Sequence, residues 1–248
     1  MIGMAKKIFV LFIAAWPFWL HSCSSSSELS DCNPVGGRTD ICLVFDNDPA
    51  LAQHKPLIQE LISEAFGQIN AKMPIDNLTI EIVANTQQTI PEIGIGGFNP
   101  STEKIIIYIN PNFANLVASM EKELGPQLAH EIHHAKRRRS VGYGNTLLQA
   151  MVSEGLADHF SIEVFGIDPP LWSIALEEAE LQQWIATASE TWNESGYNHS
   201  TWFFGTTSEV PRWAGYSIGF ELVKKYLEAN PTERPSNLHD EVAASFEP

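Results

Sequence analysis

Basic residues, long apolar runs and cysteines are all scarce in this sequence of 248 residues. It has 15 Lys and Arg residues against 30 Asp and Glu residues, and the formal charge of −15 argues against a nucleic-acid partner, which would need a basic surface. The apolar run at residues 8–20 contains Pro17 and is shorter than the roughly 20 residues of a membrane-spanning helix, which disfavours a permanent transmembrane helix. None of the three cysteines lies near the paired histidines at 130 and 134, so we expect no cysteine ligand for a metal there.

Apolar and aromatic residues, in contrast, are abundant enough for a folded core. Hydrophobic residues make up 44% of the chain, with seven Trp and 13 Phe residues, as is typical of a globular protein. A chain of this length can bury a sizeable core, and we expect residues 40–248 to form a single domain without internal repeats.

The first residues have the pattern of an export signal. Two lysines precede the apolar run, and small residues follow it before Cys23. Residues 20–23, Leu-His-Ser-Cys, resemble a bacterial lipobox, in which cleavage leaves a lipid-modified cysteine as the first residue. We therefore expect a lipoprotein signal peptide at 1–22 and a lipid anchor at Cys23 with a linker to residue 39; ordinary secretion is the alternative. By this resemblance Ser24 indicates a bacterial cell envelope protein held at the outer membrane, facing the periplasm or the surface.

The remaining two cysteines form an even pair. With Cys23 consumed by lipid, Cys32 and Cys42 would reach an oxidising compartment together. We expect a disulfide that closes this short loop, and two free thiols are the alternative.

Hydrophobic periodicity predicts a strand-rich first half and a helical second half. Alternating or β-branched runs predict strands at residues 41–45, 78–83 and 104–109, with an amphipathic helix at 49–70 and loops or turns at 24–39 and 94–97. Later apolar spacing predicts helices at 113–123, 127–138, 146–165, 170–192 and 213–227. A small mixed sheet followed by helices is an α+β fold.

The candidate site centres on His130-Glu131-Ile132-His133-His134. His130 and His134 are four residues apart, so on a helix both imidazoles project from one face and can share one Zn²⁺. Glu131 lies beside them, suited to accept a proton from a metal-activated water. Two solvent-facing histidines on an ordinary helix are the alternative.

A third ligand is available twenty residues later. Glu154 lies in a predicted helix, and Gly142 and Gly144 allow that helix to run antiparallel to the first. Two histidines and one glutamate are a known catalytic zinc set that leaves one position open. Asp158, four residues on, lies on the same helix face and is placed to accept the second N–H of a ligand histidine.

This pattern, His-Glu-x-x-His followed by Glu154-x-x-x-Asp158, resembles the gluzincins, the thermolysin-like metallopeptidases. The segments 128–135, 153–158 and 213–219 are also similar to the family of predicted zinc-dependent proteases called domain of unknown function 2268. The resemblance implies a zincin-like metallopeptidase domain, with His130, His134 and Glu154 as ligands, Glu131 as general base and Asp158 as the partner of His130.

For other side chains the sequence leaves more than one role open. A gluzincin needs a donor for the oxyanion, and our candidates are Tyr216 first, then Tyr143 and His199. We expect His133 either at the surface or among the side chains that surround the ligands, because it points away from both of them. Residues 136–139, Lys-Arg-Arg-Arg, suit a helix C-terminus, with the gripping of a substrate carboxylate or a lipid head group as the alternative. The strand 104–109 is either an edge that binds extended peptide or an ordinary core strand.

Three classes of function fit these features. The first is a zinc peptidase at the cell envelope that cleaves a peptide or protein. The second is another zinc hydrolase, or an amidase of cell-wall peptides, with the same centre. The third is a non-catalytic envelope lipoprotein, which the intact Glu131 disfavours because a structural site needs no base.

Overall fold

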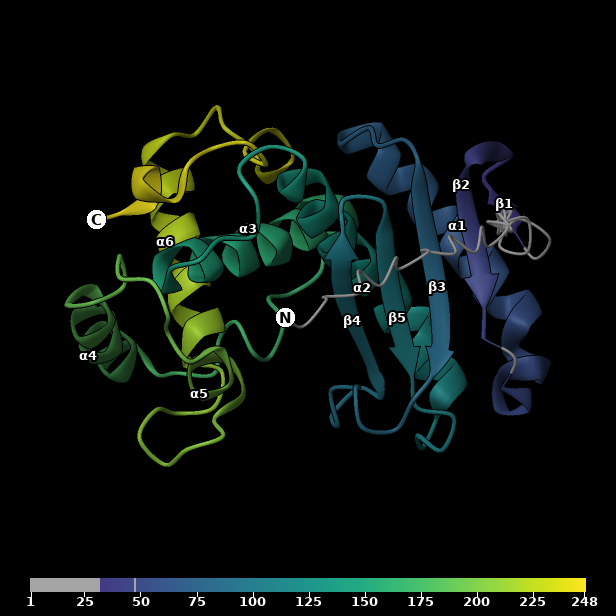
Figure 1. The fold of residues 1–248 in the computed structure, drawn as a ribbon, viewed down its shortest axis with the longest axis horizontal. Helices are drawn as coiled ribbons and strands as arrows, with labels where there is room; N and C mark the ends of the chain where they lie inside the picture. The colour runs from purple at the N-terminus through teal and green to yellow at the C-terminus, as the bar shows by residue number, and fades with distance from the viewer. Residues whose placement is uncertain (1–31, 47) are drawn as a thin grey trace, which may run out of the picture. The chain divides into compact units, whose positions relative to one another are not determined.

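The computed structural model describes residues 32–46 and 48–248; one half is a sheet covered by helices, and the other half contains helices without strands (Figure 1). The expected signal peptide and the lipid anchor at Cys23 lie outside the described residues. Within the described part of the chain, no helix is long and apolar enough to cross a membrane. The α+β class expected from the sequence is confirmed.

The sheet half is a five-stranded mixed sheet in the order β1-β2-β3-β5-β4. The three central strands run parallel, whereas each edge strand is antiparallel to its neighbour. Alternate isoleucines of the inner strands, such as Ile80 and Ile107, are fully buried, because a β-branched run places every second side chain on the covered face. The strands are β1 (Asn33–Val35), β2 (Arg38–Phe45), β3 (Leu78–Ala84), β4 (Ile95–Ser101) and β5 (Lys104–Ile109).

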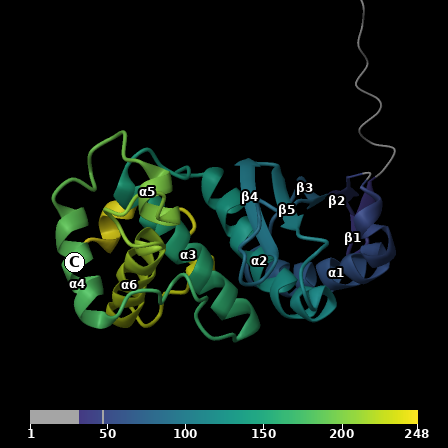
Figure 2. The same ribbon diagram turned by 90° about the horizontal axis from the view of Figure 1, so that it is seen from below.

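Two helices cover one face of this sheet, as Figure 2 shows. After the short 3₁₀ helix η1 (Pro49–His54), helix α1 (Lys55–Lys72) buries its apolar stripe, which includes Ile58, Ile62 and Ile69. Helix α2 (Leu116–Arg138) packs beside α1 and against the edge strand β4. The helix that carries the histidine pair therefore lies directly under the edge of the sheet.

The second half is helical. It contains α3 (Leu147–Phe165), α4 (Glu178–Ser189), α5 (His199–Phe204), α6 (Ala214–Ala229) and the 3₁₀ helices η2 (Pro235–Asn237) and η3 (Ala243–Phe246). Helix α3 starts with a capping box, in which the Thr146 side chain accepts from the Gln149 N–H. Helices α3 and α6 cross closely at two glycines, since a Cβ atom on Gly155 would overlap the backbone of Gly219. This crossing fixes α3 against α6, and α3 also packs against α2.

Several predicted boundaries were wrong. The helices expected at 113–123 and 127–138 are one helix, because Pro126 costs α2 only one backbone hydrogen bond while buried side chains on both sides hold the helix together. The helix expected at 170–192 is limited to α4, because tertiary hydrogen bonds of Trp172 and Ser173 with Asp158 hold the segment before it in a non-helical path. Strands also occupy parts of the loops expected at 24–39 and 94–97, and α5 was not expected.

The strand at 104–109 is not an edge. It is β5, which pairs with β3 on one side and with β4 on the other, so it has no free edge for a peptide. The hypothesis of peptide binding there was wrong, because the turn-prone glycines that precede it belong to an additional strand, β4, which forms the edge.

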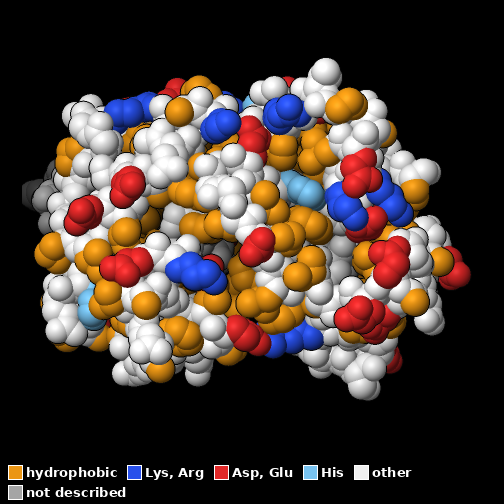
Figure 3. Space-filling view, turned by 180° about the vertical axis from the view of Figure 1, so that it is seen from behind, with side chains coloured by type: hydrophobic (Ala, Val, Ile, Leu, Met, Phe, Trp, Pro, Cys, Tyr) orange, Lys and Arg blue, Asp and Glu red, His pale blue; other side chains and the backbone are white. Residues whose placement is uncertain are grey.

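The predicted disulfide is confirmed. Cys32 and Cys42 are bonded, with their Cα atoms 5.3 Å apart, and the bond joins the start of the β1–β2 hairpin to the middle of β2. On the face shown in Figure 3, Asp and Glu side chains of the described residues are spread over the surface, and Lys and Arg side chains form no continuous patch.

Candidate metal centre

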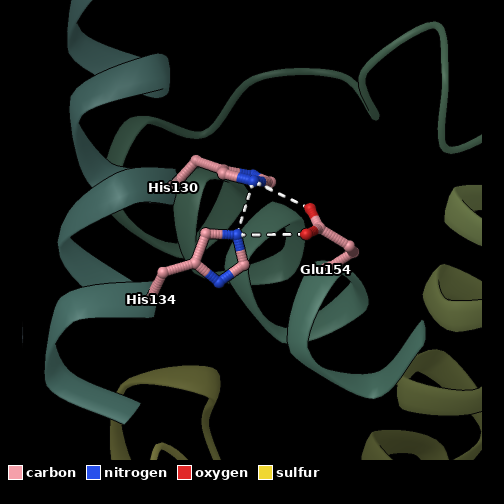
Figure 4. Close-up of side chains that lie close together, drawn as sticks. All are labelled: His130, His134 and Glu154. Atoms are coloured by element: carbon pink, nitrogen blue, oxygen red, sulfur yellow. Dashed lines mark hydrogen bonds and ion pairs between the residues drawn. The ribbon is translucent and has the colours of Figure 1, made fainter. Parts of the chain in front are cut away.

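Helix α2 delivers two imidazoles to one point. His130 and His134 are 7% and 6% exposed, and their Nε2 atoms lie 3.0 Å apart (Figure 4). The two rings are nearly perpendicular, at 86°. Because the residues are four apart on a helix, the backbone alone brings both Nε2 atoms to the same face.

Helix α3 delivers a carboxylate to the same point. Glu154 is 5% exposed, with Oε2 at 3.0 Å from His130 Nε2 and Oε1 at 3.4 Å from His134 Nε2. Tyr143, in the turn between α2 and α3, donates its hydroxyl to Glu154 Oε1 at 2.5 Å. The predicted convergence of the three side chains is confirmed: they form a group that could hold a metal ion, with all ligand atoms within 4.8 Å of one another.

The hydrogen bond between His130 and Asp158 indicates how this group fits a cation. The His130 Nδ1–H donates to Asp158 Oδ1 at 2.8 Å, so in the neutral ring Nε2 carries a lone pair. That lone pair faces a second imidazole nitrogen and a carboxylate. The neighbouring His134 and His130 outweigh burial and hold the pKa of Glu154 well below its usual value, so this residue is anionic. Such a buried set of N and O donors suits Zn²⁺.

The carboxylate of Asp158 is itself held in place. Trp172 Nε1 donates to both of its oxygens, at 3.2 and 3.1 Å, and the Ser173 hydroxyl donates to Oδ2. Ser217 of α6 then donates to the carbonyl of Trp172 at 3.0 Å. The orientation of His130 therefore depends on a chain of contacts that reaches α6. Neither Trp172 nor Ser173 was expected here, because both lie in an irregular loop.

Glu131 lies beside the donors without joining them. Its Oε1 accepts from Gln127 Nε2 at 3.1 Å, while its Oε2, although buried, has no hydrogen-bond partner among the described residues. Burial, opposed by the nearby His130 and His134, raises the pKa of Glu131. A buried carboxylate oxygen left without a partner is suited to take a proton from a reactant.

A cleft of about 770 Å³ opens onto these residues. One wall is the edge strand β4 with the loop before it, and the other contains Tyr143, Tyr197, His199 and Tyr216 from the helical half. All three oxyanion donors that the sequence suggested therefore line the same cleft as the metal group. Tyr197, which was not expected, shares a hydrogen bond with His199 Nδ1 at 3.1 Å.

The three donor candidates are not equivalent. The Tyr143 hydroxyl is already committed to Glu154, as described above. The Tyr216 hydroxyl has no hydrogen bond to any described residue, and burial raises its pKa well above the usual value, so it stays protonated. Tyr216 is held at the cleft by edge contact with the Phe203 ring, at a centroid distance of 5.0 Å. Of the three tyrosines that line the cleft, Tyr216 is the one whose O–H remains available to a ligand.

His133 is not at the surface, which was one of the two positions expected for it. It is completely buried, packs on Phe160 and donates through Nε2 to the carbonyl of Pro235 at 3.3 Å. Burial lowers its pKa well below the usual value. The side of α2 opposite the ligands is covered by the C-terminal segment, which the helix period alone did not indicate.

Comparison with known protein families gives a match over most of the chain. The family described as "Predicted Zn-dependent protease (DUF2268)" matches residues 58–246, a span that includes every residue of the metal group and its surroundings. No curated protein and no solved structure matches the chain.

Proposed function

Because the chain belongs to this family of predicted zinc-dependent proteases, we propose that it is a zinc metallopeptidase that hydrolyses peptide bonds in its cleft. The observation that carries the proposal is the meeting of His130, His134 and Glu154 beside the unpartnered Oε2 of Glu131. A structural zinc site is normally closed by four protein ligands, whereas this group has three and opens onto a cleft.

The residues divide the work of hydrolysis as follows. Zinc held by the three donors would lower the pKa of a bound water toward 7 and polarise the scissile carbonyl. Glu131 takes the proton from the attacking water on Oε2 and passes it to the leaving amine, while Gln127 keeps the carboxylate oriented through Oε1. The Tyr216 hydroxyl donates a hydrogen bond to the oxyanion that develops on the carbonyl oxygen.

The edge strand β4 is the proposed platform for an extended substrate. Gly96 and Gly97 line the cleft beside Glu131. The space that their side chains would need is filled by the Gln88 carbonyl at Gly96 and by Glu131 at Gly97, so the backbone of β4 lies directly against the proposed base. A peptide that pairs with β4 would extend the sheet by one strand and lie across the metal group.

A direct test compares the wild-type protein with Glu131→Gln. The wild type should bind about one zinc ion and cleave peptides, and the variant should bind zinc equally well and lose at least 100-fold in kcat. Glu121→Gln, an exposed change on the same helix, is the matched control. Wild-type protein that binds zinc but cleaves no member of a peptide library would refute the proposal, and cell-wall peptides in that library distinguish an amidase from a protease.

We further propose that the protein acts at the bacterial cell envelope, anchored by lipid on Cys23. The supporting features are the export-like segment before this residue and the Cys32–Cys42 disulfide, since disulfides form in oxidising compartments. Incorporation of a labelled fatty acid into the wild type, and its loss in Cys23→Ser, would test this. Label retained in Cys23→Ser would refute the anchor.

A further inference from the structure

Arg138 is the only cation of the segment Lys136–Arg139 that lines the cleft among the described residues. The other three bind protein groups elsewhere. Lys136 donates to a backbone carbonyl, Arg139 pairs with the carboxylate of Asp76, and Arg137 is 2% exposed and donates to carbonyls of the C-terminal segment. Contacts with other segments therefore account for three of the four charges, whereas Arg138 lines the cleft.

The guanidinium of Arg138 is held at one edge and free at the other. Its Nε donates to Asn99 Oδ1 at 2.8 Å and its Nη2 donates to the Asn99 carbonyl at 3.0 Å. Asn99 is 5% exposed and is anchored in turn, because its Nδ2 donates to the carbonyls of Ser101 and Lys104. Of the five N–H donors of an arginine, these contacts use two, so the Nη1–Nη2 edge remains available for a bidentate bond to a carboxylate.

No described carboxylate neutralises this charge. Arg212, the other arginine of the cleft, is paired with both oxygens of Glu92 at 2.7 and 3.2 Å, whereas Arg138 has no ion pair among the described residues. The acidic residues that line the cleft are Glu131 and Glu154, which belong to the metal centre. The cleft thus presents one fixed, unpaired cation at the end of β4.

The position of Arg138 on α2 limits how far a carboxylate bound to it can lie from the scissile bond. Arg138 follows His134 by one helical turn, which is a rise of about 6 Å, and an extended peptide advances about 3.3 Å per residue. If the proposed peptidase function holds, we propose that Arg138 selects substrates that carry a carboxylate within about three residues of the scissile bond. The carboxylate belongs either to an Asp or Glu side chain or to the C-terminus of the peptide.

The test uses zinc-loaded full-length protein and alanine-rich octapeptides. One Glu is moved through successive positions, each peptide is also made with Gln, and each is made with a free or an amidated C-terminus. We expect kcat/KM to be about 10- to 100-fold higher for the carboxylate form at one position, and we expect Arg138→Gln to remove this preference. Arg138→Lys keeps the positive charge but loses the two parallel N–H donors of the guanidinium, so it should keep only part of the preference for the carboxylate form. Arg139→Gln is the matched control and should keep the preference.

Dissociation constants of the same peptides with Glu131→Gln give a readout that needs no turnover. Tighter binding of the Glu peptide than of the Gln peptide identifies a site for an acidic side chain. Tighter binding of the free C-terminus than of the amidated one identifies an exopeptidase-like site. The inference is overturned if cleavage and binding do not depend on the carboxylate, or if Arg138→Gln keeps the preference. In either case, cleavage of the peptides would still support the proposed function. Arg138-dependent binding of these peptides by the wild type without any cleavage would support carboxylate recognition by Arg138 and refute the peptidase proposal.

Discussion

Gly97 of the edge strand lies directly against the side chain of Glu131. A Cβ atom at position 97 would fall 2.6 Å from Cδ of that carboxylate. The contact joins β4, the proposed substrate platform, to the proposed general base on α2. It also explains why the strand is made of glycine at this point: the space that a side chain would fill is taken by the base.

Gly97→Ala should impair catalysis without emptying the metal centre. The added methyl displaces the Glu131 carboxylate, since the clash is with its side-chain carbons, and a misplaced base costs about 100-fold or more in kcat. The zinc content should not change, because His130, His134 and Glu154 do not touch this methyl. Gly67→Ala is the control: it lies in α1 with open space around it and should leave kcat unchanged.

Ser173→Ala should weaken zinc binding. The Ser173 hydroxyl is one of the donors that orient Asp158, and Asp158 orients His130. Loss of such outer contacts typically lowers metal affinity by about 10- to 100-fold. Competition with a fluorescent chelator measures this constant, with Ser189→Ala on the exposed side of α4 as control. Equal affinity in the two variants would show that Trp172 alone is enough to hold the carboxylate.

His159 should make the folded state less stable as the pH falls through 6.5. Its ring stacks on Phe220 at a centroid distance of 4.0 Å, and burial lowers its pKa, an effect that Lys224 reinforces and Asp158 opposes. Below the unfolded value of 6.5 the unfolded chain binds a proton that the folded chain does not, so the free energy of unfolding decreases.

The corresponding measurement is denaturant unfolding of wild type and His159→Gln, both at the same zinc content, from pH 7.5 to 5. The decrease should be smaller in the variant, by up to about 1.4 kcal/mol per pH unit. Parallel pH profiles of the two proteins would show that His159 takes up its proton equally well in the folded state.

Gly219→Ala should destabilise the helical half. The Cβ atom of the introduced alanine would overlap the backbone of Met151. Because a backbone cannot move aside by a change of rotamer, α3 and α6 must separate. We expect a loss of about 1–3 kcal/mol in the free energy of unfolding together with weaker zinc binding, because Glu154 is on the displaced helix. Gly67→Ala again serves as control, and an unaltered zinc affinity would show that Glu154 can follow the metal despite the shift.

Sequence reasoning succeeded where the signal was local and periodic. The two histidines share a helix face by spacing alone, and Glu154 reaches them because a short glycine-containing turn reverses the chain between α2 and α3. The same reasoning missed what depends on distant segments. Pro126 indicated a break that tertiary packing overrides, and the contacts of Asn99 with Arg138 or of Ser173 with Asp158 join irregular segments that carry no periodic pattern.

The donors of the metal centre come from opposite halves of the fold: the imidazoles from the helix under the sheet and the carboxylate from the helical half. A metal ion bound by both imidazoles and the carboxylate would therefore cross-link the two halves in addition to its part in catalysis. Chelation would leave α2 and α3 joined by packing and by hydrogen bonds such as that of His130 with Asp158. Limited proteolysis of the metal-free protein would then measure how much the ion adds to the stability of this contact.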